Sequence, residues 1–220
     1  MGHKRNYSVR PFRYEVMAHV PVYSGAMRSL ILAVTAAILA TGCVAESSTK
    51  PVEFLDARSA LTVGALRQPI ELVPNNRSNG PLRLVGRQHA SFAYLGPVEW
   101  DRSGQILYGL WVHVAPGAGI ELGDIRAAQV LVLQLDDGAV SLTPMDAPQT
   151  GHAPYEPIAA WGQTTYFALD AATLKRMAAS NKLTLDVRAE GGETVNFFPT
   201  SDTKSVLASF IDARGGLTPD

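Results

Sequence analysis

The chain has 220 residues, with 19 Lys and Arg against 20 Asp and Glu, and its 19 glycines and 14 prolines are close to average usage. This composition excludes a low-complexity or collagen-like chain. From Cys43 onward there are 14 Lys and Arg and 19 Asp and Glu, a net charge of −5. That mild acidity argues against nucleic acid as a partner and against a polybasic membrane patch, because both need clustered Lys or Arg.

An uncharged apolar run covers residues 30–40 and corresponds to about 16 Å of helix at ~1.5 Å per residue. A membrane span needs about 20 such residues, so the run is too short to be one. It suits the hydrophobic region of a secretory signal peptide, with Met27 and Arg28 in front of it.

The run ends at Ala40-Thr41-Gly42-Cys43, and Cys43 is the only cysteine of the chain. This stretch resembles the lipobox of bacterial lipoprotein precursors. The resemblance implies cleavage before Cys43, a diacylglycerol on its sulfur and an acylated (palmitate-type) new N-terminus. Two or more acyl chains anchor a protein stably, whereas one holds it only marginally. Val44 follows the cysteine where a retained inner-membrane lipoprotein would carry Asp, so family analogy favours the outer membrane, with the domain facing the periplasm.

Two alternatives remain for this segment: an ordinary cleaved signal peptide, or a buried core helix with an incidental cysteine. A lone cysteine in an exported chain also fits a free thiol or an intermolecular disulfide. The expected organisation is a non-native N-terminal extension over residues 1–26, with translation starting at Met27, and a lipoprotein signal peptide over 27–42. A lipidated tether over 43–52 then leads to a single β-rich domain over 53–220.

Strand patterns dominate the middle of the domain. The turn Asp101-Arg102-Ser103-Gly104 predicts a hairpin, and residues 105–114 are apolar on both alternating faces, which is typical of a central strand covered on two sides. Asp137-Gly138 predicts a second tight hairpin.

Near the C-terminus, residues 164–169 read as a strand and Asp170 as the N-cap of a helix that ends near Asn181. Residues 182–189 alternate between apolar and polar, and Gly191-Gly192 marks a hairpin turn. Ser201 is the expected cap of a last helix, which ends at Gly215. The predicted fold class is α+β: mainly an antiparallel β-sheet or sandwich with two short C-terminal helices.

Three groups of residues are candidates for chemistry. Tyr94, Trp100, Tyr108 and Trp111 cluster around one predicted hairpin and form a candidate ligand surface for glycan or peptide; the alternative is core packing. His89 and His113 are metal candidates, with Glu99 or Asp101 as a further ligand, but their spacing is not that of a zinc site. Ser201 and Lys204 have the S-x-x-K spacing of serine acyl-transfer enzymes, although the same residues suit a helix start.

These patterns favour a non-enzymatic binding or accessory module of the cell envelope, anchored to the outer membrane through lipid on Cys43, with envelope proteins or glycan as candidate partners. No cofactor is expected. The alternative is a periplasmic hydrolase whose site is assembled from dispersed His and carboxylate residues. A deep pocket holding His89 or His113 beside a carboxylate would favour the hydrolase.

Overall fold

A computed structural model describes residues 50–74, 91–117, 121–127 and 130–217. The chain divides into two units, Met1–Ala45 and Glu46–Asp220, and every described residue belongs to the second. Cys43, the signal-peptide segment and residues 1–26 therefore lie outside the described residues. Within the described ranges, no helix is both long and apolar enough to cross a membrane.

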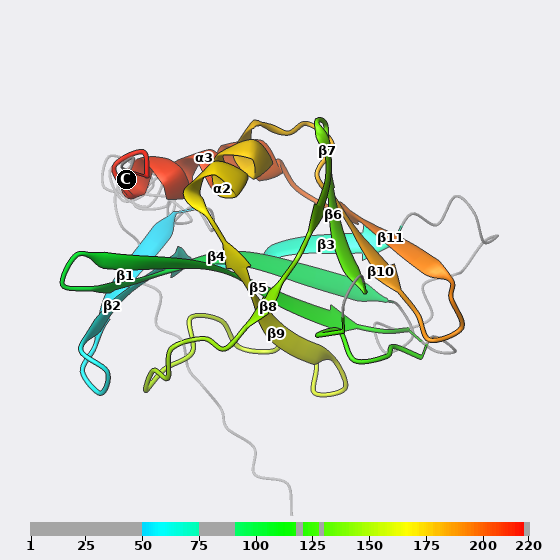
Figure 1. The fold of residues 1–220 in the computed structure, drawn as a ribbon, viewed down its shortest axis with the longest axis horizontal. Coiled ribbons are helices and arrows are strands. Elements are labelled where there is room, and N and C mark those ends of the chain that lie inside the picture. The colour runs from blue at the N-terminus through cyan, green and yellow to red at the C-terminus, as the bar shows by residue number, and fades with distance from the viewer. Residues whose placement is uncertain (1–49, 75–90, 118–120, 128–129, 218–220) are drawn as a thin grey trace, which may run out of the picture. The chain divides into compact units, whose positions relative to one another are not determined.

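One antiparallel sheet of eleven strands forms the described part of the domain and curves into a half-barrel (Figure 1). The N-terminal strands are β1 (Pro51–Asp56), β2 (Leu61–Leu66), β3 (Ile70–Pro74), β4 (Phe92–Arg102) and β5 (Gln105–Ala115). The remaining strands are β6 (Leu131–Leu135), β7 (Gly138–Ser141), β8 (Pro144–Met145), β9 (Gln163–Leu169), β10 (Thr184–Arg188) and β11 (Thr194–Pro199). The spatial order is β7-β6-β10-β11-β3-β4-β5-β9-β8, with β2 also paired to β4 and β1 to β2.

The long strand β4 organises the sheet because β2 and β3 share one of its edges. Thr62 of β2 lies opposite Asp101, near one end of β4, and Leu72 of β3 lies opposite Ala93, near the other. The sheet therefore branches at this edge: β1 extends one branch, and β11, β10, β6 and β7 extend the other.

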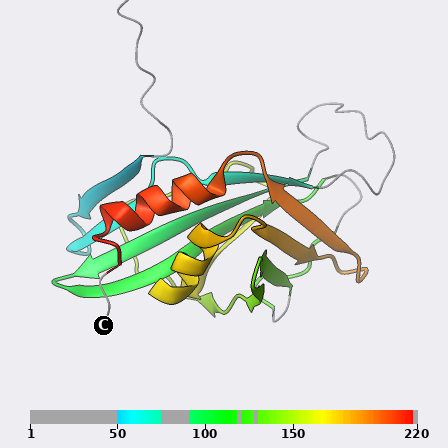
Figure 2. The ribbon, with the colours of Figure 1, turned by 90° about the horizontal axis from the view of Figure 1, so that it is seen from above.

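Two short helices cover one face of the sheet, which we call the helix-covered face (Figure 2). These helices are α2 (Ala171–Ala179) and α3 (Thr203–Ala213). Their buried residues, among them Leu174, Leu207 and Phe210, belong to the same apolar core as strand residues. The opposite, outer face carries Tyr94, Trp100, Trp111 and His113, and the segment of residues 146–162 packs over part of it.

The structure confirms the predicted α+β class and resolves the choice between sheet and sandwich in favour of one curved sheet. The turn at residues 103–104 joins β4 to β5, with positive φ at Ser103 and Gly104. The prediction that residues 105–114 are covered on both faces holds from Gly109 onward, but it is wrong for the start of β5, where Ile106 and Leu107 are exposed beside the turn. β10 alternates polar Thr184 and Asp186 with buried Leu185 and Val187, also as predicted.

The helix caps agree with the sequence in one case and differ in the other. Asp170 caps α2 by accepting a hydrogen bond from the Thr173 backbone N–H. The prediction that Ser201 caps α3 is wrong: the cap is Asp202, whose carboxylate accepts from the N–H groups of Lys204 and Ser205. A carboxylate is favoured here because it bonds the free N–H groups and also faces the positive end of the helix dipole.

Candidate functional site

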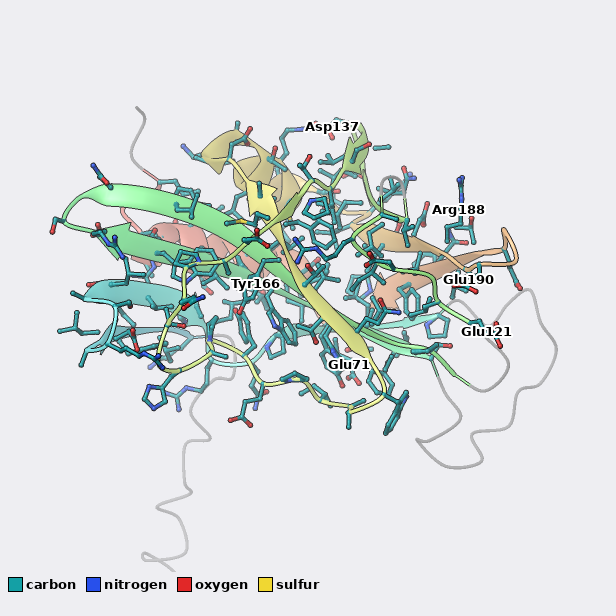
Figure 3. All side chains as sticks on the ribbon, turned by 60° about the horizontal axis from the view of Figure 1, so that its bottom comes forward. Glu71, Glu121, Asp137, Tyr166, Arg188 and Glu190 are labelled. Carbon is teal, nitrogen blue, oxygen red and sulfur yellow. The ribbon has the colours of Figure 1, made fainter. Side chains whose placement is uncertain are left out.

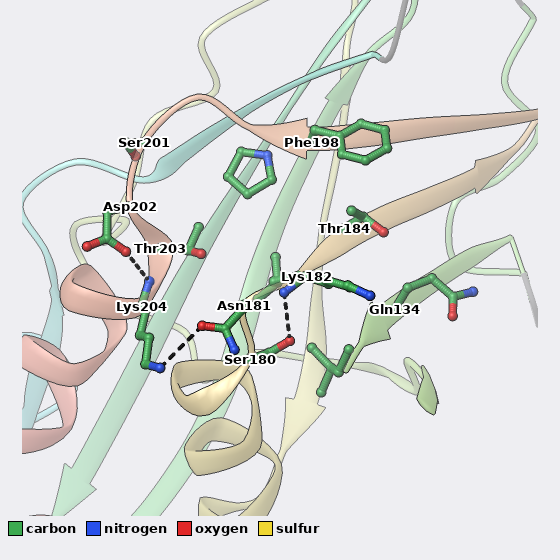
Figure 4. A pocket seen from close by; sticks show the side chains of 13 residues that line it. Gln134, Ser180, Asn181, Lys182, Thr184, Phe198, Ser201, Asp202, Thr203 and Lys204 are labelled. Atoms are coloured by element: carbon green, nitrogen blue, oxygen red, sulfur yellow. Dashed lines mark hydrogen bonds between the residues drawn. The ribbon is translucent and has the colours of Figure 1, made fainter. Parts of the chain in front are cut away.

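A pocket of about 620 Å³ opens where the last turn of α2, the first turn of α3 and the ends of three strands meet (Figure 4). Ser180, Asn181 and Lys182 enter from the connection between α2 and β10, and residues 201–204 enter from the start of α3. The strands β6, β10 and β11 contribute the remaining wall. This volume lies within the range of roughly 300–1,000 Å³ that is typical of small-molecule sites.

Hydrogen bonds fix the loops that form the pocket. The Ser180 hydroxyl accepts from the backbone N–H groups of Asp136 (3.1 Å) and Lys182 (3.3 Å). The Asn181 backbone N–H donates to Asp136 Oδ2 at 2.7 Å, and Lys204 Nζ donates to Asn181 Oδ1 at 3.3 Å. The α2–β10 connection is therefore tied to both β6 and α3, which holds the mouth of the pocket in place.

Positive charge dominates the pocket wall. Lys182 and Lys204 line it together with one carboxylate, Asp202, whose Oδ1 accepts the capping hydrogen bonds of α3. Hydrogen bonds from Ser205, which have the largest effect, and from Lys204 hold the pKa of Asp202 below its usual value. The carboxylate therefore stays ionised at the start of α3. No hydrogen bond or ion pair joins Lys182 Nζ to another side chain within the described ranges, and Figure 4 shows it extending toward Gln134.

The candidate ligand surface is divided between the two faces of the sheet. Along β4 and β5, alternate residues share a face, and Tyr94, Trp100 and Trp111 fall on the outer one. Tyr108 lies opposite Glu99, on the helix-covered face. Trp100 and Trp111 are buried, while Tyr94 and Tyr108 are partly exposed. The four rings therefore do not form one accessible surface.

The outer face carries a chain of packed rings that the sequence does not reveal (Figure 3, where Tyr166 is labelled). The Trp111 ring stacks on His113 at 5.8 Å and lies 5.2 Å from Tyr155, and the Trp100 ring meets Tyr166 edge-on at 5.5 Å. Burial raises the pKa of Tyr166 to about 12, so the ring stays neutral. These contacts are core packing built on the outer side of the sheet.

Tyr155 attaches the segment of residues 146–162 to the outer face. Its ring lies directly over Gly96, where an added Cβ would be 2.3 Å from a ring carbon. Its hydroxyl accepts from the Leu66 N–H at 2.9 Å and donates to the Pro97 carbonyl at 3.0 Å. Burial raises the pKa of this hydroxyl far above its usual value. The absence of a side chain at Gly96 is thus what allows the segment to close over the sheet.

His113 is fully buried, and both of its ring nitrogens are engaged. Nε2 lies 3.3 Å from the Ala159 backbone N–H and accepts from it, while Nδ1 lies 2.8 Å from Thr164 Oγ1. The hydrogen-bond pattern therefore assigns the proton to Nδ1. Burial lowers the pKa of His113, which keeps the ring neutral. This histidine acts as a packed link between β5, β9 and the covering segment.

The metal candidates are not brought together in the described structure. His89 lies outside the described residues, and His113 has no lone pair left for a cation. Glu99 is buried on the helix-covered face, 3.6 Å from Arg214 Nη1, and Arg214 also contacts Glu53. Burial raises the pKa of Glu99, and Arg214 opposes that shift. Across the described ranges, no three His, Cys, Asp or Glu residues are arranged to hold a metal ion.

The S-x-x-K residues lie at the mouth of the pocket but lack the contact that acyl transfer requires. Lys204 Nζ is bonded to Asn181, and no hydrogen bond joins it to the Ser201 hydroxyl. A base must reach the hydroxyl proton that it removes. The arrangement in Figure 4 is that of a helix start beside a pocket.

A comparison of the chain with known protein families, with characterised proteins and with solved structures finds no match. The function must therefore be argued from the residues themselves. The pocket was missed at the sequence level because its wall comes from β6, β10, β11 and the ends of two helices. Only the alternation around β10 indicated part of the pocket, because it places Lys182 and Thr184 together on the polar side of the strand.

Proposed function

We propose that the protein is a lipoprotein of the bacterial outer membrane, anchored through lipid on Cys43 and facing the periplasm. Its folded domain acts as a non-enzymatic binding or accessory module of the cell envelope. The observation that carries the proposal is the sequence of residues 27–43, in which a short apolar run ends at Ala40-Thr41-Gly42-Cys43. Two or more acyl chains on one cysteine are sufficient for stable membrane attachment.

Two features of the structure support the binding role. The pocket at the ends of α2 and α3 is lined by lysines, hydroxyls and apolar side chains, which suits recognition of a ligand. His113, the described residue that the hydrolase alternative needs, is buried and uses both ring nitrogens in hydrogen bonds. A general base must keep a nitrogen accessible to its substrate.

Expression of the chain in a Gram-negative host with a radiolabelled fatty acid tests the anchor. We expect the label on the mature protein, a membrane-bound fraction, and an N-terminal lipopeptide beginning at Cys43 in mass spectrometry. The Cys43→Ser variant should lose the label and accumulate as an uncleaved precursor. If this variant matures to the same size and still fractionates with membranes, the proposed anchor is wrong.

Mass spectrometry of the precursor made from the gene with its own upstream sequence tests the expected start of translation at Met27. A precursor peptide that contains Tyr7 or Tyr14 would show that residues 1–26 are translated, and would contradict that expectation.

A further inference from the structure

An apolar row crosses the outer face of the sheet beside the pocket. Phe198 of β11 lies directly opposite Val73 of β3. The register that places Leu72 opposite Ala93 brings Val73 level with Phe92 of β4. The Phe92 ring meets the Trp161 ring edge-on at 6.3 Å.

The members of this row are unusually exposed for large apolar side chains. The exposed fractions are 37% for Phe198, 39% for Val73 and 52% for Trp161, and Phe92 is partly exposed. With strands roughly 4.8 Å apart, the row spans about 10 Å from β11 to β4 before it reaches Trp161. A contiguous exposed row of this kind marks a binding surface more often than a scatter of single residues does.

The pocket and the row are continuous through Phe198, which belongs to both. The pairing of Leu185 with Phe197 brings Thr184 level with Phe198, and Gln134 lies opposite Thr184. The pocket and the row therefore form one continuous surface, in which the pocket is the polar end and no helix or strand lies between the two parts.

The polar end offers hydrogen-bond donors in excess. Lys182 supplies an ammonium group that no described side chain bonds, and Lys204 supplies a second one that is bonded to Asn181. Asp202 caps α3, and Asp186 accepts from Gln134 Nε2 at 2.9 Å and Asn196 Nδ2 at 2.6 Å. An anionic group entering the pocket meets two cations and one carboxylate, Asp202, which is bonded through Oδ1 to the start of α3.

From this geometry we infer that the outer face binds a single-chain amphiphile, with an anionic head group on Lys182 at the mouth of the pocket and an apolar tail along Phe198, Val73 and Phe92 toward Trp161. The inference rests on the proposed function only in taking the domain to be a binding module. The head group is a carboxylate or a phosphate monoester, since either accepts a charge-assisted hydrogen bond from an ammonium group.

Affinity is measured on the full chain carrying Cys43→Ser, which removes the lipidation site, by titration with dodecanoate and with dodecyl phosphate below their micellar concentrations. Tryptophan fluorescence is the readout. Trp161 is the exposed indole of the row, whereas Trp100 and Trp111 are buried. We expect saturable binding of the anionic amphiphiles, a signal that Trp161→Phe removes, and no comparable binding of dodecyltrimethylammonium. The stronger of the two anions identifies the head-group class.

Variants of each end separate the two halves of the inference. Lys182→Gln should weaken binding by up to about fivefold, the usual contribution of an exposed ion pair, and Lys204→Gln should weaken it less, because Lys204 is already bonded to Asn181. Val73→Ser should weaken it by roughly fivefold through lost apolar contact. The matched controls are Lys50→Gln and Leu55→Ser, at exposed positions outside the pocket and the row.

A photoreactive dodecanoate gives a second readout that does not depend on affinity. Its cross-links should map to peptides containing Val73, Phe92 or Phe198. The inference is overturned if the cationic amphiphile binds equally well or if the cross-links are confined to other peptides. It is also overturned if the protein binds anionic vesicles or apolar peptides but not the single-chain anions. Because Cys43 is already replaced, these outcomes are independent of whether lipidation occurs.

Discussion

The two faces of the sheet are packed by different means although they share the same strands. In β5, Leu110 and Val112 point to the helix-covered face, where apolar side chains of α2 and α3 meet them in the core. Trp111 and His113 point to the outer face, where aromatic rings and hydrogen bonds join them to residues 155–164. One face is thus stabilised mainly by apolar burial, and the other depends on polar groups finding their partners.

The comparison shows where each face is vulnerable. Apolar packing loses stability in proportion to the volume removed, so a truncated core side chain is costly wherever the surroundings cannot relax. A buried polar contact contributes little net stability but is expensive to break on one side only. Three substitutions measure this difference.

The largest effect is expected for Phe210→Ala on the helix-covered face. Phe210 is completely buried between α3 and the sheet, and truncation of a buried phenylalanine costs about 3–5 kcal/mol. Urea unfolding followed by circular dichroism measures the change. Phe198→Ala, the same substitution at a side chain that is 37% exposed, is the control and should cost clearly less. Equal losses would mean that α3 is not part of the core.

An intermediate effect is expected for Tyr155→Phe on the outer face. The ring stays over Gly96, but the Leu66 N–H loses its acceptor in a buried site, which costs about 1–3 kcal/mol. Amide exchange should accelerate at Leu66. Tyr166→Phe is the matched control, since no hydrogen bond joins its hydroxyl to another described residue, and it should change stability by no more than about 0.5 kcal/mol. A Tyr155→Phe protein as stable as the parent would contradict the role of this hydroxyl.

The smallest effect is a pH dependence that arises from His113. Burial lowers the pKa of His113 in the folded state, so the unfolded chain binds more protons at mildly acidic pH. The contribution of His113 to the free energy of unfolding is therefore fully present above its pKa in the unfolded chain, about 6.5. It falls as the pH drops below that value, by at most about 1.4 kcal/mol per pH unit, until the pKa in the folded protein is reached.

The measurement is the free energy of unfolding between pH 7.5 and 5 for the parent and for His113→Gln. The slopes of the two curves against pH are compared, and one titrating group changes such a slope by at most ~1.4 kcal/mol per pH unit. The parent should show the steeper loss, and the difference between the two curves isolates this residue. Parallel curves would show that His113 is charged or accessible in the folded protein.

Much of the fold was accessible from the sequence because local signals agreed with the final structure. The positive-φ turn at residues 103–104, the alternation along β10 and the Asp170 cap each depend on residues that are close in the chain. The cap of α3 was misplaced by one residue because Ser201 and Asp202 are both good caps, and only the backbone path selects one.

The candidate sites were harder to predict, since alternation shows that two residues share a face but not what covers it. Trp100 and Trp111 carry the aromatic signal of a binding surface, yet a segment about 45 positions further along the chain, including Tyr155, packs against Trp111. The exposed row of Phe198, Val73 and Phe92 depends on the pairing of β11 with β3, which are more than 100 residues apart.

The sequence by itself determined the α+β class, the main hairpins, the two C-terminal helices and the expectation of a lipid anchor at Cys43. These depend on short-range backbone preferences and on one contiguous motif. Tertiary structure alone decided which strands are neighbours, that Gly96 admits Tyr155, and that Lys182 and Lys204 share a pocket adjoining an apolar row. Such long-range contacts follow from how the whole core packs, and no local pattern specifies that.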